Sequence, residues 1–113
     1  MVKEKLNMLQ RFRMKHTRAF WIDKNKKYYK SKQISDDYLK KIAFFISEGK
    51  GWSLFLCNRR DRINNIFEEI YKRKILPAEA VLNLHARAEY MFGFSESYPN
   101  IRYTWEGKFE RLE

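Results

Sequence analysis

One helix start constrains the fold of this chain more than any other local feature. Ser35 is followed by two aspartates. A side-chain oxygen and negative charges satisfy the free amide groups and the positive dipole end at a helix N-terminus. Ile34 and Leu39 flank this start at the spacing of a hydrophobic staple. The sequence therefore predicts a helix that begins after Ser35, and Gly49 is the residue at which we expect it to stop.

Apolar residues recur at three- and four-residue intervals in this helix and in two later segments, which is typical of helices that bury one face. We expect the second helix over residues 59–73, capped by Asn58, and the third to have Pro77 at its first position and to end at Gly93. The three stripes comprise Leu39, Ile42, Ala43 and Ile46; Ile63, Ile66, Phe67, Ile70 and Tyr71; and Val81, Leu84, His85, Ala88, Met91 and Phe92.

Shorter segments have the composition of strands. Residues 19–22 and 27–30 are rich in aromatic residues and flank a polar Asp/Asn turn, which predicts a hairpin. Alternating apolar residues over 101–105 predict a terminal strand before a turn at residues 106–107, and we expect this strand to pair with the hairpin. A further helix is predicted over about residues 3–15. The apolar run 52–57 is too short to classify.

Together these segments predict a helix-dominated α+β domain with three to four helices and a small antiparallel hairpin or sheet. The chain has 113 residues and no repeat or linker, so we expect residues 1–113 to form a single domain. Its 9 Phe, 7 Tyr and 3 Trp exclude disorder by composition. No stretch has the roughly 20 apolar residues of a membrane-spanning helix, and no secretory signal is visible. We therefore expect a cytoplasmic protein with no membrane partner.

Positive charge is concentrated in the first part of the chain. Residues 1–74 carry 20 lysines and arginines against 8 acidic residues, whereas residues 75–113 carry 4 against 6. A basic excess of this kind attracts polyanions. Two clusters are the candidate phosphate-binding residues: Lys24, Lys26, Lys27, Tyr28, Lys30 and Lys32 in the predicted hairpin, and Arg59, Arg60 and Arg62 at the start of the second helix.

The residue types in these clusters suit nucleic acid. Lysines neutralise phosphates, and tyrosine rings stack on bases. Arginines at a helix N-terminus add bidentate contacts to the amide groups that already favour an anion there. A structural interpretation stays open, in which the lysines only protect an edge strand and the tyrosines belong to the core.

Catalytic and metal-binding motifs are missing from the sequence. Two histidines and one cysteine match no zinc, nucleophile or phosphate-loop pattern, and we expect His85 to be a packed, hydrogen-bonded side chain. The adjacent Asp36 and Asp37 point in different directions at a helix start, so we interpret them as capping residues. Glu68 and Glu69 have the spacing of ion pairs within a helix. No catalytic residue, metal or cofactor is predicted, and we expect a non-enzymatic binding protein.

The stretch from Trp21 to Ile42 resembles small uncharacterised accessory proteins of tailed bacteriophages. The residues that carry the resemblance are Trp21, Asp23-Lys24, Ile34, Asp36-Asp37, Tyr38, Leu39 and Ile42. The chain departs from the pattern at Asn25 or Lys26, where a glycine is usual, and at Tyr38, where histidine is commoner. The resemblance implies a phage-encoded protein, and either nucleic-acid handling or the blocking of a host protein or signal.

Three functions fit these observations. The first is binding of nucleic acid or another phosphate-bearing ligand through the two basic clusters. The second is an anti-defence or host-takeover role, in which the protein binds an acidic host protein surface or sequesters a nucleotide signal. The third is a structural or assembly role, for which homo-oligomer formation would be the sign. The sequence leaves all three open.

Overall fold

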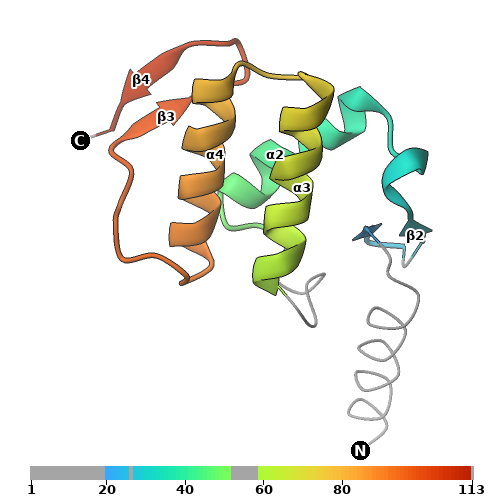
Figure 1. The fold of residues 1–113 in the computed structure, drawn as a ribbon. Helices are drawn as coiled ribbons and strands as arrows, with labels where there is room; N and C mark the ends of the chain where they lie inside the picture. The colour runs from blue at the N-terminus through green and yellow to red at the C-terminus, as the bar shows by residue number, and fades with distance from the viewer. Residues whose placement is uncertain (1–19, 26, 52–58, 113) are drawn as a thin grey trace, which may run out of the picture.

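The computed structural model describes residues 20–25, 27–51 and 59–112. Within these ranges three α-helices, α2 (Asp36–Ser47), α3 (Arg59–Arg73) and α4 (Ala78–Met91), each pack against the other two (Figure 1). A short 3₁₀ helix, η1 (Ser31–Gln33), precedes α2. The helix-dominated α+β fold is confirmed. The predicted helix over residues 3–15, the run 52–57 and the Asn58 cap lie outside the described residues.

Both ends of α2 form as predicted. The backbone N–H of Tyr38 donates to Ser35 Oγ at 3.2 Å, and the staple residues Ile34 and Leu39 are both buried. After the helix, Gly49 takes a φ of +79°, a left-handed conformation that side chains disfavour. A Cβ at this position would lie 2.9 Å from Met91 Cε, the flexible end of that side chain, so glycine is favoured here mainly by its backbone conformation.

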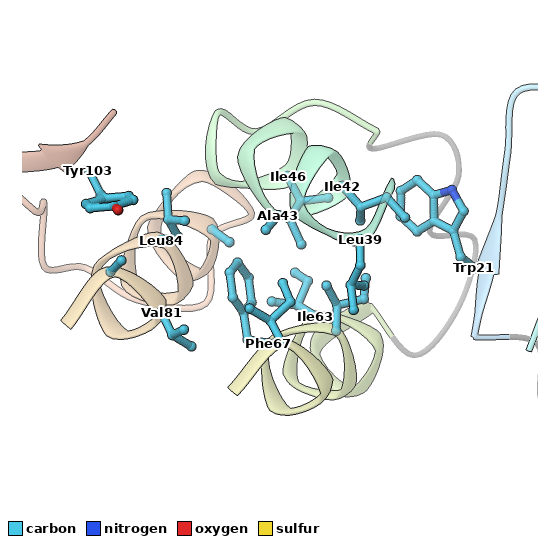
Figure 2. Packing of buried hydrophobic residues seen from close by; sticks show 14 of the residues in the cluster. Trp21, Leu39, Ile42, Ala43, Ile46, Ile63, Phe67, Val81, Leu84 and Tyr103 are labelled. Atoms are coloured by element: carbon cyan, nitrogen blue, oxygen red, sulfur yellow. The ribbon is translucent and has the colours of Figure 1, made fainter. Parts of the chain in front are cut away.

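The apolar stripes of the three helices meet in one core, part of which Figure 2 shows. Tyr71 and Met91 are exceptions, with 63% and 44% of their surface exposed. Both lie at the edge of a stripe near the end of a helix, and in each case the adjacent residue, Ile70 or Phe92, is buried in the core instead. Pro77 caps α4 with an extended ψ of 150°, so the helix begins at Ala78, one residue later than predicted. Gly93 follows the end of α4 with a φ of +82°, as expected of a helix stop.

Two separate antiparallel hairpins lie on opposite sides of the helices (Figure 1). In the first, β1 (Trp21–Ile22) pairs with β2 (Tyr28–Tyr29), so the predicted N-terminal hairpin is confirmed. In the second, β3 (Ile101–Tyr103) pairs with β4 (Phe109–Arg111). Figure 2 shows one buried aromatic residue from each hairpin at opposite ends of the core, Trp21 beside Ile42 and Tyr103 near Leu84.

The predicted pairing of the terminal strand with the N-terminal hairpin is wrong. The chain folds back locally instead, through a turn in which the Thr104 N–H donates to the Lys108 carbonyl at 2.7 Å. The other edge of β3 is occupied by the side chain of Asn83 on α4. Its amide donates to the Ile101 carbonyl at 2.8 Å and its oxygen accepts from the Tyr103 N–H at 2.9 Å. Because Asn83 takes the bonds that a second strand would need, β3 has no place for the N-terminal hairpin.

Candidate functional site

The turn between β1 and β2 is built around the carboxylate of Asp23. Asp23 Oδ1 accepts from the backbone N–H groups of Asn25 and Lys27, each at 2.9 Å, and Oδ2 accepts from the Tyr29 hydroxyl at 3.1 Å. The hydrogen bond from Lys27 is the main cause that lowers the pKa of Asp23. An ionised aspartate therefore organises a turn that contains no glycine, and it holds Lys24 and Asn25 at an exposed tip.

A pocket of about 310 Å³ lies between this turn and α2. Helix α2 contributes four lining residues at positions i, i+3, i+4 and i+7, a spacing that places side chains on one helix face. The turn and β1 contribute the other four. The complete lining is Trp21, Asp23, Lys24, Asn25, Tyr38, Lys41, Ile42 and Phe45.

Aromatic contacts fix one wall of the pocket. The indole Nε1–H of Trp21 donates to the Tyr38 hydroxyl at 2.9 Å. The ring of Tyr29 meets the ring of Tyr38 edge-on, with 5.6 Å between the centroids. Phe45 completes the apolar part of the lining and keeps 39% of its surface exposed. The pocket therefore has a fixed aromatic wall and one accessible phenyl ring.

The polar groups around the pocket are available to a ligand. Within residues 20–25, 27–51 and 59–112, neither Lys24 nor Lys41 forms an ion pair with a carboxylate. In the same ranges the side-chain amide of Asn25 makes no hydrogen bond, and the hydroxyl of Tyr38 accepts one without donating any. Two ammonium groups and two hydrogen-bonding groups thus lie beside the apolar, aromatic residues of the pocket. The Asp23 carboxylate also lines it, and its oxygens accept hydrogen bonds from the turn and from Tyr29.

The four described lysines of the predicted hairpin cluster are exposed, whereas Tyr28 and its neighbour Tyr29 are partly buried. Lys24, Lys27, Lys30 and Lys32 face solvent, and the Lys27 ammonium lies 5.1 Å from the ring centroid of Tyr29. Tyr28 is half-buried, and Tyr29 packs against the core. Each interpretation of this cluster therefore describes part of it: Tyr29 has a structural role, and the lysines are open to a partner. Lys26 lies outside the described residues.

The second predicted cluster is divided between surface and interior. Arg59 is the first residue of α3, and Arg60 is exposed. Arg62 is buried, with 7% of its surface exposed, so it does not share the exposed surface to which Arg60 belongs. The charge of Arg60 contributes to lowering the pKa of His85 on α4. Arg60 therefore lies near His85, on the side of α3 that faces α4.

Arg73 at the end of α3 anchors the segment that carries the exposed lysines. Its guanidinium donates to the carbonyls of Ser31 and Ile34 at 2.5 and 2.7 Å, to Asp36 at 3.1 Å and to Glu69 at 2.8 Å. The interactions with Glu69 and Asp36 raise the pKa of Arg73, and the hydrogen bond to Glu69 contributes most. The Glu69 pair confirms the predicted spacing within the helix, but sequence reasoning missed the contact with η1 and the start of α2.

Lys24 is the one pocket residue among the predicted binding residues, and Lys41 and Phe45 are two of those that sequence reasoning missed. The sequence does indicate that both share a helix face with Tyr38, because they follow it by three and seven residues. Neither residue belongs to the predicted apolar stripe of α2, which consists of Leu39, Ile42, Ala43 and Ile46. Only the position of the β1–β2 turn shows that this side of α2 has a neighbour.

A second pocket, of about 380 Å³, lies against the C-terminal hairpin. Three of its four charged residues form ion pairs: Arg102 pairs with Glu110, and Glu48 pairs with Lys50 at 3.2 Å. The fourth, Glu106, forms none among the described residues. The Lys40 ammonium lies over one face of the Trp105 ring, 4.2 Å from the centroid, while 46% of the surface of Trp105 stays exposed. The lining consists of Phe44, Ser47, Glu48, Arg102, Tyr103, Thr104, Trp105, Glu106 and Glu110.

His85 is packed and hydrogen-bonded, as predicted. Its Nε2 lies 2.7 Å from Asn64 Oδ1 and 3.0 Å from a carboxylate oxygen of Glu89, and its ring stacks on Phe67 with 5.0 Å between centroids. Burial lowers the pKa of His85 and outweighs the opposite effect of Glu89. In the described part of the chain, no group of three or more His, Cys, Asp or Glu residues is placed to hold a metal ion. None of its helices is both long and apolar enough to cross a membrane.

Comparisons with known proteins identify no relative of this chain. No protein-family model matches the chain, and no curated protein or solved structure matches it significantly. The resemblance to phage accessory proteins therefore stays a prediction from residues 21–42, and the candidate function depends on the site alone.

Proposed function

We propose that this protein is a non-enzymatic, cytoplasmic binding protein that engages nucleic acid through the exposed lysines of the β1–β2 hairpin and η1. The observation that carries the proposal is the absence of ion pairs at Lys24, Lys27, Lys30 and Lys32 among the described residues. Arg73 and Arg102 are paired with carboxylates. Lys72, Lys108 and Arg111 are exposed and form no ion pair among the described residues either, so it is the closeness of the hairpin and η1 lysines in the chain that sets them apart.

A surface of exposed, unpaired lysines is well suited to bind phosphate groups. An unpaired lysine keeps its full charge for an external anion, and each phosphate that it neutralises releases condensed counterions. The anchoring of Ser31 and Ile34 by Arg73 holds the backbone between the lysines in place. The lysines are therefore presented on an ordered segment, which reduces the entropy lost on binding.

The test compares two triple variants with equal loss of charge. Lys24→Ala/Lys27→Ala/Lys30→Ala removes three cations from the proposed surface, and Lys72→Ala/Lys108→Ala/Arg111→Ala removes three exposed cations elsewhere. Binding to a labelled oligonucleotide is measured by fluorescence anisotropy over a salt series. Three lost phosphate contacts should weaken binding roughly 10- to 100-fold near 0.15 M salt and flatten the log–log salt slope by about 2.

The control variant should keep the wild-type slope and lose little affinity. Equal loss in the two variants would mean that only net charge matters, and would contradict the proposal. No binding of the wild-type protein near physiological salt would contradict it as well.

A second candidate function is binding of a host protein, in keeping with the proposed phage origin. Its supporting observation is the exposed apolar group on the C-terminal hairpin, where Ile101, Trp105 and Phe109 are 40–49% exposed. Aromatic residues are enriched in the cores of protein interfaces. In an assay of phage growth, this function predicts dependence on Trp105 and Phe109 and tolerance of the lysine variant.

A further inference from the structure

We propose that the pocket between the β1–β2 turn and α2 receives one unpaired nucleobase, so that the protein binds single-stranded rather than duplex nucleic acid. This inference rests on the proposed function and names the form of nucleic acid that the lysine surface takes. It also adds Phe45, Lys41, Asn25 and Tyr38 to the residues that contact the ligand.

The floor of the pocket suits a flat aromatic ring. Trp21, Tyr38 and Ile42 supply apolar surface, and the partly exposed phenyl ring of Phe45 is open to stacking. A volume of about 310 Å³ lies at the small end of the roughly 300–1,000 Å³ typical of ligand pockets. Bases within a duplex have both faces covered by their neighbours, whereas an unpaired base offers its faces to aromatic side chains.

The rim of the pocket supplies the polar partners that a nucleotide needs. The Asn25 amide offers a donor and an acceptor to a base edge, and the Tyr38 hydroxyl has a proton to donate. Lys24 reaches the rim from the turn and Lys41 from α2. Two ammonium groups on different elements are placed for the phosphates on the two sides of a bound base.

The arrangement of the remaining lysines favours a strand over a free nucleotide. Lys27, Lys30 and Lys32 are exposed along β2 and η1 and do not line the pocket. A single nucleotide in the pocket has no phosphates for these residues, whereas a strand that continues from the pocket brings one phosphate per nucleotide. The three lysines outside the pocket are therefore better explained by a strand with several phosphates than by a single nucleotide.

The test measures single-strand preference in the wild-type protein and in variants of Phe45. Labelled oligothymidylate of about 12 nucleotides, within the site sizes known for single-strand binders, is compared with a duplex of the same length at one salt concentration. The wild-type protein should bind the single strand more tightly. Phe45→Ala should weaken single-strand binding roughly 5- to 100-fold, the range of one lost base–aromatic stack, and leave duplex binding unchanged.

Two further variants keep the test decisive. Phe45→Trp retains a stacking surface and should preserve the preference even if Phe45→Ala is poorly folded. Phe109→Ala removes an exposed phenyl ring from the opposite hairpin and should change nothing. Equal wild-type affinity for the two forms, or unchanged single-strand binding by folded Phe45→Ala, would overturn the inference.

The outcomes also separate this inference from the function on which it rests. Absence of wild-type binding to either form would overturn the proposed function itself. Salt-dependent binding to both forms alike would leave that function intact and remove only the pocket's role. Thymidine monophosphate that binds as tightly as the oligonucleotide would overturn the assignment to a strand.

Discussion

The two hairpins of this domain lie on opposite sides of the helices and carry similar residue types with different pairing (Figure 1). Each combines aromatic rings with lysine or arginine beside a pocket next to α2. At the C-terminal hairpin, Arg102 is bound by Glu110 and Lys40 covers Trp105. At the N-terminal hairpin, Lys24 and Lys41 have no such partner among the described residues. The basic residue that lines the C-terminal pocket, Arg102, is thus paired within the protein, whereas the two lysines that line the N-terminal pocket are available to a ligand.

The largest effect on stability is expected at Arg73, which joins η1, α2 and α3. Arg73→Ala removes four charge-assisted hydrogen bonds and should lower the free energy of unfolding by about 2–3 kcal/mol. The matched change is Arg102→Ala, which breaks an exposed pair and should cost less than about 1 kcal/mol. Chemical denaturation measures both. Equal losses would contradict the anchoring role of Arg73.

A smaller loss is expected from Asp23→Asn, which weakens the N-terminal turn. Because the pKa of Asp23 is lowered in the folded protein, its ionised form stabilises the fold above the ordinary carboxyl value of 3.8. That contribution is lost as the pH falls through the lower folded value. The stability difference between wild type and Asp23→Asn should therefore be constant at neutral pH and shrink below about pH 4. A difference independent of pH would contradict this role.

At the C-terminal hairpin, Lys40→Met tests whether the covered tryptophan belongs to the fold alone. Removal of the ammonium from the Trp105 ring should lower stability by about 0.5–1 kcal/mol and leave oligonucleotide binding unchanged. Thermal unfolding and the anisotropy assay provide the two readouts. A loss of binding as large as that of the hairpin variant would mean that the two pockets act together.

The smallest effect concerns His85, which reports on the position of Arg60. Arg60→Ala removes a nearby positive charge and should raise the pKa of His85, whereas Glu89→Gln should lower it further. NMR titration of the imidazole distinguishes the two directions. Because the folded pKa is already lowered, neutral His85 stabilises the fold above the unfolded value of about 6.5, and this is lost as the pH falls through the folded value. An unchanged pKa in Arg60→Ala would place Arg60 away from α4.

Local sequence signals predicted most of the described fold. Ser35, Ile34 and Leu39 act within one helical turn, and Gly49 ends the helix through its own backbone conformation, so neighbouring residues suffice to identify them. The pairing of β3 depended on Asn83, a side chain on another element whose two hydrogen bonds imitate a strand. No periodicity in the sequence indicates such a contact.

The candidate site was only half predictable for the same reason. The lysines of the hairpin are adjacent in the chain, so their cluster is visible in the sequence. Lys41 and Phe45 lie beside them because the β1–β2 turn packs on α2. The turn and α2 are separated in the sequence, and composition does not predict that they are in contact. The burial of Arg62 likewise depends on tertiary packing. Arg60 and Arg62 belong to the same run of charged residues, and their composition does not show that one is exposed and the other buried.

The most direct test of the account is an NMR titration of the tryptophan indole N–H signals with the single-stranded oligonucleotide. Trp21 lines the proposed base pocket and donates to Tyr38, whereas Trp105 lies at the opposite hairpin beneath Lys40. Single Trp→Phe variants assign the signals. The account predicts that the Trp21 signal shifts progressively with ligand while the Trp105 signal stays in place. A shift at Trp105 with none at Trp21 would contradict it.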